Sequence, residues 1–147
     1  MLDIVIEARI ANISEAMKVK RILPFRLRRM VGPFIFLDHA GPVAEVPKTW
    51  SSLDVKPHPH IGLSTVSYLF NGQVTHRDSL GVEQVIRPGE VNWMTAGSGI
   101  AHSERFENPA ALAGRNGGIS NRRWQFRRGD PAAPRLERVT DLGDNGG

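Results

Sequence analysis

Two short clusters of metal-ligand side chains stand about forty residues apart in this chain of 147 residues. The first contains His58 and His60, and the second contains His102 and Glu104. Successive side chains of an extended strand point to opposite faces, so residues at i and i+2 share a face. Each pair can therefore present two ligands on one side of a strand. If the two strands lie in opposed or neighbouring sheets, three imidazoles and one carboxylate converge on one point.

Imidazole nitrogens and a carboxylate suit a first-row divalent metal ion, either iron(II) or one of manganese, copper, nickel, cobalt and zinc. The chain has no cysteine, which excludes disulfides, thiolate zinc sites and cysteine nucleophiles. Four protein ligands on a six-coordinate ion leave two positions for a bidentate oxygen substrate or for dioxygen. The alternative is that each histidine is a surface residue or a hydrogen-bonded core residue. His39 has no metal-binding companion at i+2, so we expect it to be structural or to lie at a pocket rim.

The segments around these pairs are predicted to be short β-strands of one domain, because the chain is too short for two ordinary domains. It contains 15 glycines and 10 prolines, which indicate many turns. Residues 63–70 alternate as a strand does, and Asn71-Gly72 then predicts a hairpin turn with positive φ. Further strands are predicted between turns as far as residue 94. This spacing favours an all-β, antiparallel barrel or sandwich.

The glycine-rich stretch at residues 95–99 is not a phosphate-binding loop, because it lacks the lysine and the following helix. We expect it to be a barrel corner where backbones approach closely, which would aim His102 and Glu104 inward.

The distribution of charge argues against nucleic acid as a partner, although the net charge is +4. The basic excess lies in residues 1–31 and 115–147, whereas the middle with the candidate ligands is mildly acidic. A nucleic-acid interface is more usually a basic face on the folded part. No secretory signal is apparent, and no segment approaches the ~20 apolar residues of a membrane span. We therefore expect a soluble cytoplasmic protein.

Longer motifs surround the two ligand pairs. They are His58-Pro-His60-x-Gly62, Thr65-Val66-Ser67-Tyr68-Leu69, His76-Arg77-Asp78, Pro88-Gly89 and Trp93-Met94-Thr95-Ala96-Gly97-x-Gly99-Ile100-x-His102-x-Glu104. Over roughly residues 10 to 107 the sequence resembles the N-terminal cupin domain of the pirin family. The last motif is the most specific of them.

The resemblance implies a cupin-type jelly-roll barrel that holds one iron(II) ion through His58, His60, His102 and Glu104. It also implies quercetin 2,3-dioxygenase activity, in which the metal binds the 3-hydroxyl and 4-carbonyl oxygens of a flavonol and dioxygen attacks the activated ring. Glu104 is the predicted ligand able to take the hydroxyl proton, so it is the candidate catalytic base. The alternative is a metal-dependent sensor, similar to a transcription cofactor, without turnover. A third hypothesis is a fragment with neither cooperative unfolding nor stoichiometric metal.

Two features depart from the family pattern. Ser64 stands where the family often has a glutamate that is not a metal ligand, so we expect this change to alter the pocket rather than the ion. Residues 1–110 are assigned to the cupin domain, and residues 111–147 form a basic, Gly- and Pro-rich tail in place of a second cupin domain. This tail indicates a truncated or frame-shifted product and lacks the apolar content for a packed layer, although Trp124 and Phe126 could pair as a makeshift strand. A face left uncovered would favour a homodimer.

Overall fold

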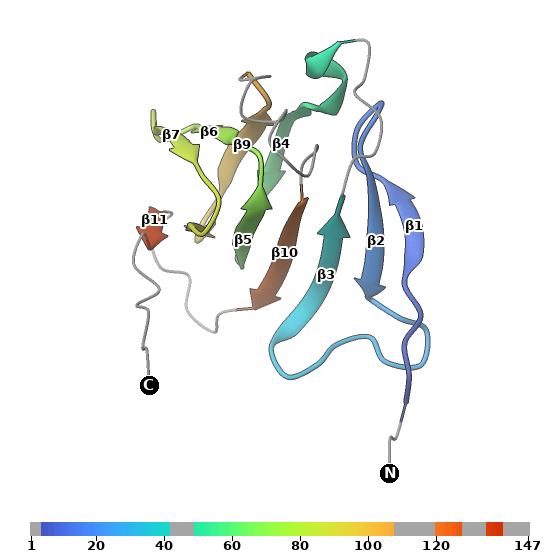
Figure 1. The fold of residues 1–147 in the computed structure, drawn as a ribbon. Helices are drawn as coiled ribbons and strands as arrows, with labels where there is room; N and C mark the ends of the chain where they lie inside the picture. The colour runs from blue at the N-terminus through green and yellow to red at the C-terminus, as the bar shows by residue number, and fades with distance from the viewer. Residues whose placement is uncertain (1–3, 42–48, 108–119, 128–134, 140–147) are drawn as a thin grey trace, which may run out of the picture.

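The computed structural model describes residues 4–41, 49–107, 120–127 and 135–139. These residues form two antiparallel β-sheets, with one short 3-10 helix, η1 (Trp50–Leu53). Figure 1 shows the larger sheet in front and strands of the smaller sheet behind it. The all-β architecture predicted from the spacing of turns is confirmed.

The larger sheet has seven strands and the smaller has four. The larger one runs in the order β1 (Arg9–Asn12), β2 (Lys18–Leu23), β3 (Phe34–Ala40), β10 (Ser120–Arg127), β5 (Leu63–Asn71), β8 (Val91–Thr95), β11 (Arg135–Val139). The smaller one runs in the order β4 (Val55–His60), β9 (Ile100–Arg105), β6 (Val74–Asp78), β7 (Glu83–Ile86). Both predicted ligand pairs therefore lie on adjacent strands of the smaller sheet.

The main apolar core joins the two sheets. It contains Leu69 of β5 from the larger sheet and Val74 and Ile86 from the smaller sheet, all at most 3% exposed. Trp50 of η1 packs against this cluster. No helix among the described residues is long and apolar enough to cross a membrane.

The turn at Asn71-Gly72 differs in part from its prediction. Gly72 has φ of 86°, the positive value expected. However, β5 and β6 belong to different sheets, so the turn is a crossing between sheets and not a hairpin. The reason is that both edges of β5 are already paired, with β8 and with β10. Strand β6 consequently pairs with β9 beside the candidate site.

The small-residue loop at residues 96–99 is a corner, as predicted, because it joins β8 of one sheet to β9 of the other. The predicted close approach of backbones is not what requires glycine at Gly99. A Cβ there would meet no heavy atom within 4 Å, but φ is 147°. Backbone conformation therefore explains this glycine, since L side chains rarely adopt such a φ.

Two strands lie within residues 111–147, the segment predicted to be a tail. Strand β10 is central, with β3 on one side and β5 on the other, and β11 pairs with β8 at the sheet edge. The makeshift strand predicted around Trp124 and Phe126 is thus an inner strand of the larger sheet. Low apolar content did not prevent this because backbone groups, not side chains, supply the hydrogen bonds of the ladder. The domain boundary at residue 110 stays a prediction.

We expect replacement of Leu69 by alanine to lower the free energy of unfolding by about 2–5 kcal/mol, because it leaves a cavity between the two sheets. Leu80→Ala is the matched control, since Leu80 is 47% exposed and should change stability by less than about 0.5 kcal/mol. Urea unfolding of both variants measures the difference. Equal losses would show that the core does not lie between the sheets.

Candidate metal centre

Strands β4 and β9 bring the two predicted ligand pairs together. They pair antiparallel, with His58 directly opposite His102 and His60 opposite Ile100. From the sequence we considered ligand strands in opposed or neighbouring sheets, whereas these strands are hydrogen-bonded neighbours within one sheet. This closer arrangement lets side chains from directly opposed residues meet, since their Cβ atoms lie about 5 Å apart.

A bulge in β4 selects which of its side chains face the site. Val55 is opposite Glu104 and His58 is opposite His102, so three steps along β4 correspond to two steps along β9. Without the extra residue, Pro57 would take the place opposite His102. The bulge reverses the alternation of faces and puts His58 there instead.

The imidazoles of His58, His60 and His102 form one cluster, in which the potential ligand nitrogens all lie within 4.8 Å of one another. The Nε2 atoms of His60 and His102 are 3.1 Å apart. Two nitrogens that bind one ion at about 2.1 Å and at right angles would lie about 3.0 Å apart. The His60–His102 separation therefore fits two ligands of a single ion.

The environment of His58 favours metal binding through one particular nitrogen. Its Nδ1 lies 2.9 Å from the backbone carbonyl oxygen of Lys56. A carbonyl oxygen only accepts hydrogen bonds, so Nδ1 carries the proton and Nε2 keeps its lone pair. A neutral imidazole held in this way already has the tautomer that metal binding through Nε2 requires.

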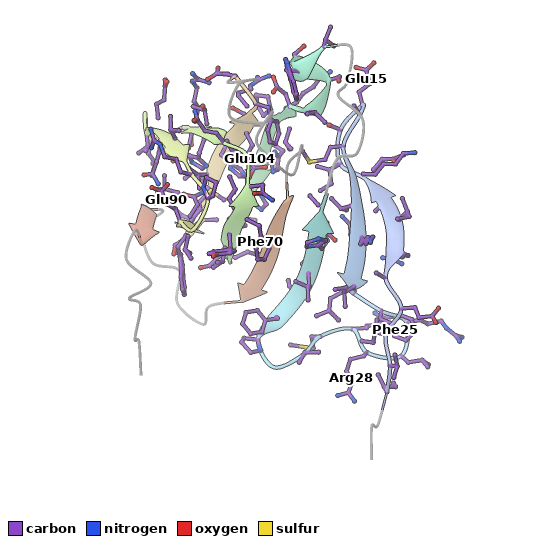
Figure 2. The ribbon with its side chains drawn as sticks, viewed as in Figure 1. Glu15, Phe25, Arg28, Phe70, Glu90 and Glu104 are labelled. Carbon is purple, nitrogen blue, oxygen red and sulfur yellow. The ribbon has the colours of Figure 1, made fainter. Side chains whose placement is uncertain are left out.

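Glu104, the fourth predicted ligand, lies beside this cluster and is not a member of it among the described residues. It follows His102 by two positions on β9, so both side chains point to the same face. The residue is 5% exposed (Figure 2 labels it within the smaller sheet). Its role as ligand and as catalytic base stays a prediction.

Sequence reasoning overlooked His76 and Asp78 as site residues. His76 on β6 is opposite Glu104, and Asp78 is opposite His102. The Nδ1 atom of His76 lies 3.3 Å from Nδ1 of His102, and its Nε2 lies 3.0 Å from Oδ2 of Asp78. A signal was present, because His76-x-Asp78 repeats the His-x-acid spacing of the second ligand pair.

Two other positions singled out from the sequence lie outside the cluster. His39 is on β3 of the larger sheet, and its ring centroid is 6.2 Å from that of Phe70. This placement agrees with a structural role for His39. Ser64 is fully buried on β5, and its hydroxyl donates to Oγ1 of Thr95 at 3.3 Å. Ser64 therefore contributes to the packing of β5 against β8.

A cavity of about 520 Å³ borders the cluster and includes His58 and His60 in its wall. This volume lies in the range of roughly 300–1,000 Å³ that is usual for small-molecule sites. Another part of the wall comes from the larger sheet and contains Arg21, Phe36 and Asp38. The cavity therefore connects the imidazole cluster to a surface of different chemistry.

Arg21 presents a fixed, planar cation to this cavity. Its Nε and Nη2 donate to the two carboxylate oxygens of Asp38, each at 2.9 Å, and its guanidinium carbon lies 4.2 Å from the ring centroid of Phe36. The hydrogen bonds to Asp38 raise the pKa of Arg21 above its usual value. This wall offers a flat surface suited to stacking with a planar, electron-rich ligand.

Comparisons with known proteins agree with this fold. The sequence model of the Pirin family matches residues 16–117. A pirin-like protein of Caulobacter vibrioides is 51% identical over 154 aligned residues, which cover 100% of this chain and 52% of the relative. The chain thus spans about half the length of that relative.

Solved structures give the same picture of the fold. The crystal structure of quercetin 2,3-dioxygenase from Acinetobacter baumannii superposes with a TM-score of 0.80 at 39% identity, covering 93% of this chain and 44% of that one. The bacterial pirin YhhW from Escherichia coli, whose structure is a complex with nickel(II), superposes with a TM-score of 0.70 at 18% identity, covering 90% of this chain and 54% of that one. The second likeness concerns the fold alone.

We expect His58→Ala, His60→Ala and His102→Ala each to abolish stoichiometric metal binding, because each removes one nitrogen of the cluster. The loss should exceed the roughly 10–100-fold effect of changes outside the ligand shell. Metal analysis of the purified variants measures it, with His39→Ala as the matched control. Unchanged metal content in all three variants would contradict the site assignment.

Proposed function

We propose that this chain, which belongs to the pirin family, binds one iron(II) ion through His58, His60, His102 and Glu104 and cleaves a flavonol such as quercetin with dioxygen. The cluster of three imidazole nitrogens is the observation that carries this proposal. Nitrogen ligands with a carboxylate and without thiolates suit an ion with open positions for a substrate, in contrast to a closed structural zinc site. The name of the similar Acinetobacter baumannii enzyme supports the choice of reaction.

The bound ion would supply Lewis-acid binding of two adjacent substrate oxygens and redox chemistry with dioxygen. The protein's own residues have three tasks. The cavity beside His58 and His60 receives the flat substrate, and Arg21 over Phe36 stacks against its rings. Glu104 accepts the proton of the 3-hydroxyl group, because its burial in the sheet keeps water from competing for that task.

The extent of the chain bears on this proposal, because it spans 52% of the Caulobacter relative and 44% of the Acinetobacter structure. Ring cleavage by this half-length chain is therefore part of what is proposed. The competing function is a metal-dependent binding protein without turnover, for which the same cluster would serve as a sensor.

We expect the iron-loaded protein to consume quercetin in air and to release carbon monoxide in proportion. Loss of quercetin absorbance and gas analysis measure the two quantities, and metal-free protein is the control. A folded sample with one iron per chain and no turnover would contradict the enzymatic proposal and favour the metal-dependent binding protein.

We expect Glu104→Gln to lower kcat by about 10²–10⁴-fold, because an amide cannot take the hydroxyl proton. The variant keeps the size of the side chain and one oxygen that can bind metal, so it should retain iron better than Glu104→Ala. Turnover per bound iron separates the two roles of this residue. A Glu104→Gln variant with normal kcat and full iron content would remove Glu104 as the base.

A further inference from the structure

A second histidine–carboxylate pair stands behind the imidazole cluster, on β6. The side chains of His76 and Asp78 are hydrogen-bonded to each other, and both are 0% exposed. His76 is opposite Glu104 in the strand register, which makes His102 its diagonal neighbour two positions away. Diagonal neighbours of this kind are within reach of long or aromatic side chains. The three residues therefore form a continuous buried chain from Asp78 through His76 to His102.

The partners of Asp78 fix the direction of hydrogen bonding at the start of this chain. Its Oδ1 accepts from the backbone N–H groups of Leu80 at 2.9 Å and of Val82 at 3.2 Å. Its Oδ2 faces Nε2 of His76 at 3.0 Å. An ionised carboxylate only accepts hydrogen bonds, so Nε2 of His76 is the donor. A neutral His76 then has an unprotonated Nδ1, which is an acceptor.

The acceptor on His76 determines the tautomer of His102. The two Nδ1 atoms are 3.3 Å apart, so a hydrogen bond between them requires His102 to carry its proton on Nδ1. Nε2 of His102 is then unprotonated, and it is the atom that faces Nε2 of His60 at 3.1 Å. Each hydrogen bond thus follows from the one before it, and the unprotonated Nε2 of His102 lies in the imidazole cluster.

We propose that His76 and Asp78 are positioning residues that hold His102 in the tautomer and orientation needed for metal binding through Nε2. The backbone carbonyl of Lys56 performs the same task for His58 with a single hydrogen bond. His102 is only 4% exposed, and its Nε2 lies within the cluster. Because the ring is buried, the partner of its Nδ1 is a protein group and not water. Outer partners of this kind typically contribute about 10–100-fold to metal affinity.

Asp78→Asn tests this proposal with little change of shape. The amide oxygen can still accept from the turn at residues 80 and 82, but its NH₂ group would face Nε2 of His76 as a donor. His76 would then carry its proton on Nδ1 and meet the Nδ1–H of His102. We expect zinc affinity, measured on the full chain by competition with a chromophoric chelator, to fall by about 10–100-fold.

Two substitutions of His76 separate positioning from packing. In His76→Gln the amide oxygen can accept a hydrogen bond from Nδ1 of His102. In His76→Leu the side chain has no acceptor for this hydrogen bond. We expect His76→Gln to retain more zinc affinity than His76→Leu. Glu83→Gln is the control for loss of a carboxylate, because Glu83 lies on β7 and pairs with the exposed Arg77. This control should bind zinc as the unmodified protein does.

The tautomer can be observed directly in the metal-free protein by long-range ¹H–¹⁵N correlation of the histidine rings. We expect Nδ1 of His102 to be the protonated nitrogen in the unmodified protein and to lose that preference in Asp78→Asn. This readout does not depend on turnover, and a merely structural role would not change it. The measurement does not depend on the stability of any variant, because the proposal already predicts the tautomer of His102 in the unmodified protein.

The proposal rests on the metal site of the proposed function, and the outcomes distinguish the two. If Asp78→Asn and His76→Leu bind zinc as tightly as the unmodified protein while His102→Ala does not, the positioning role is wrong and the site stands. If His102→Ala also binds zinc normally, the site itself is wrong and the positioning role fails with it. Protonation of His102 on Nε2 in the unmodified, metal-free protein would likewise overturn the positioning role.

Discussion

A slip of one residue between β4 and β9 would turn one set of imidazoles away from the other, because side-chain direction in a strand alternates with a period of two. The site therefore depends on this register, and contacts at both ends of the strand pair fix it. Asp54, just before β4, accepts hydrogen bonds from the backbone of Phe106 at 2.9 Å and from the side chain of Arg105 at 3.0 Å. Beyond the other end, the N–H of Gly62 donates to the carbonyl of Gly97 at 2.9 Å.

The sequence predicted the pairs within each strand better than the relation between the strands. Alternation of faces is local, so the spacing of His58 and His60, and of His102 and Glu104, sufficed to place each pair on one face. The choice of neighbouring strand depends on contacts about forty residues apart, which no local pattern specifies. The bulge after Val55 has no local signal either, because only the pairing of Val55 with Glu104 shows that β4 contains an extra residue.

The crossing after Gly72 and the inner position of β10 were not predicted, for the same reason. Asn71-Gly72 carries the signal of a hairpin, but β5 already has β8 and β10 as neighbours, so the chain after Gly72 enters the other sheet. That crossing brings His76 and Asp78 onto the strand next to β9. Strand β10 had little apolar signal, yet it is paired along both edges. In both cases long-range pairing overrode what the local sequence indicated.

The smaller sheet buries two imidazoles and a carboxylate at positions where a core built for stability alone would have apolar side chains. His76, His102 and Glu104 are each at most 5% exposed, whereas the buried apolar residues form separate clusters around Leu69 and around Met94. A buried polar group without a partner costs about 1–3 kcal/mol, so this arrangement persists only if partners are supplied. The hydrogen-bonded series from Asp78 through His76 supplies a partner at Nδ1 of His102. On the other side an ion that binds only the folded protein would add about 2.7 kcal/mol of stability at a concentration 100 times its Kd. Metal binding and the stability of this sheet are consequently coupled through the same imidazoles.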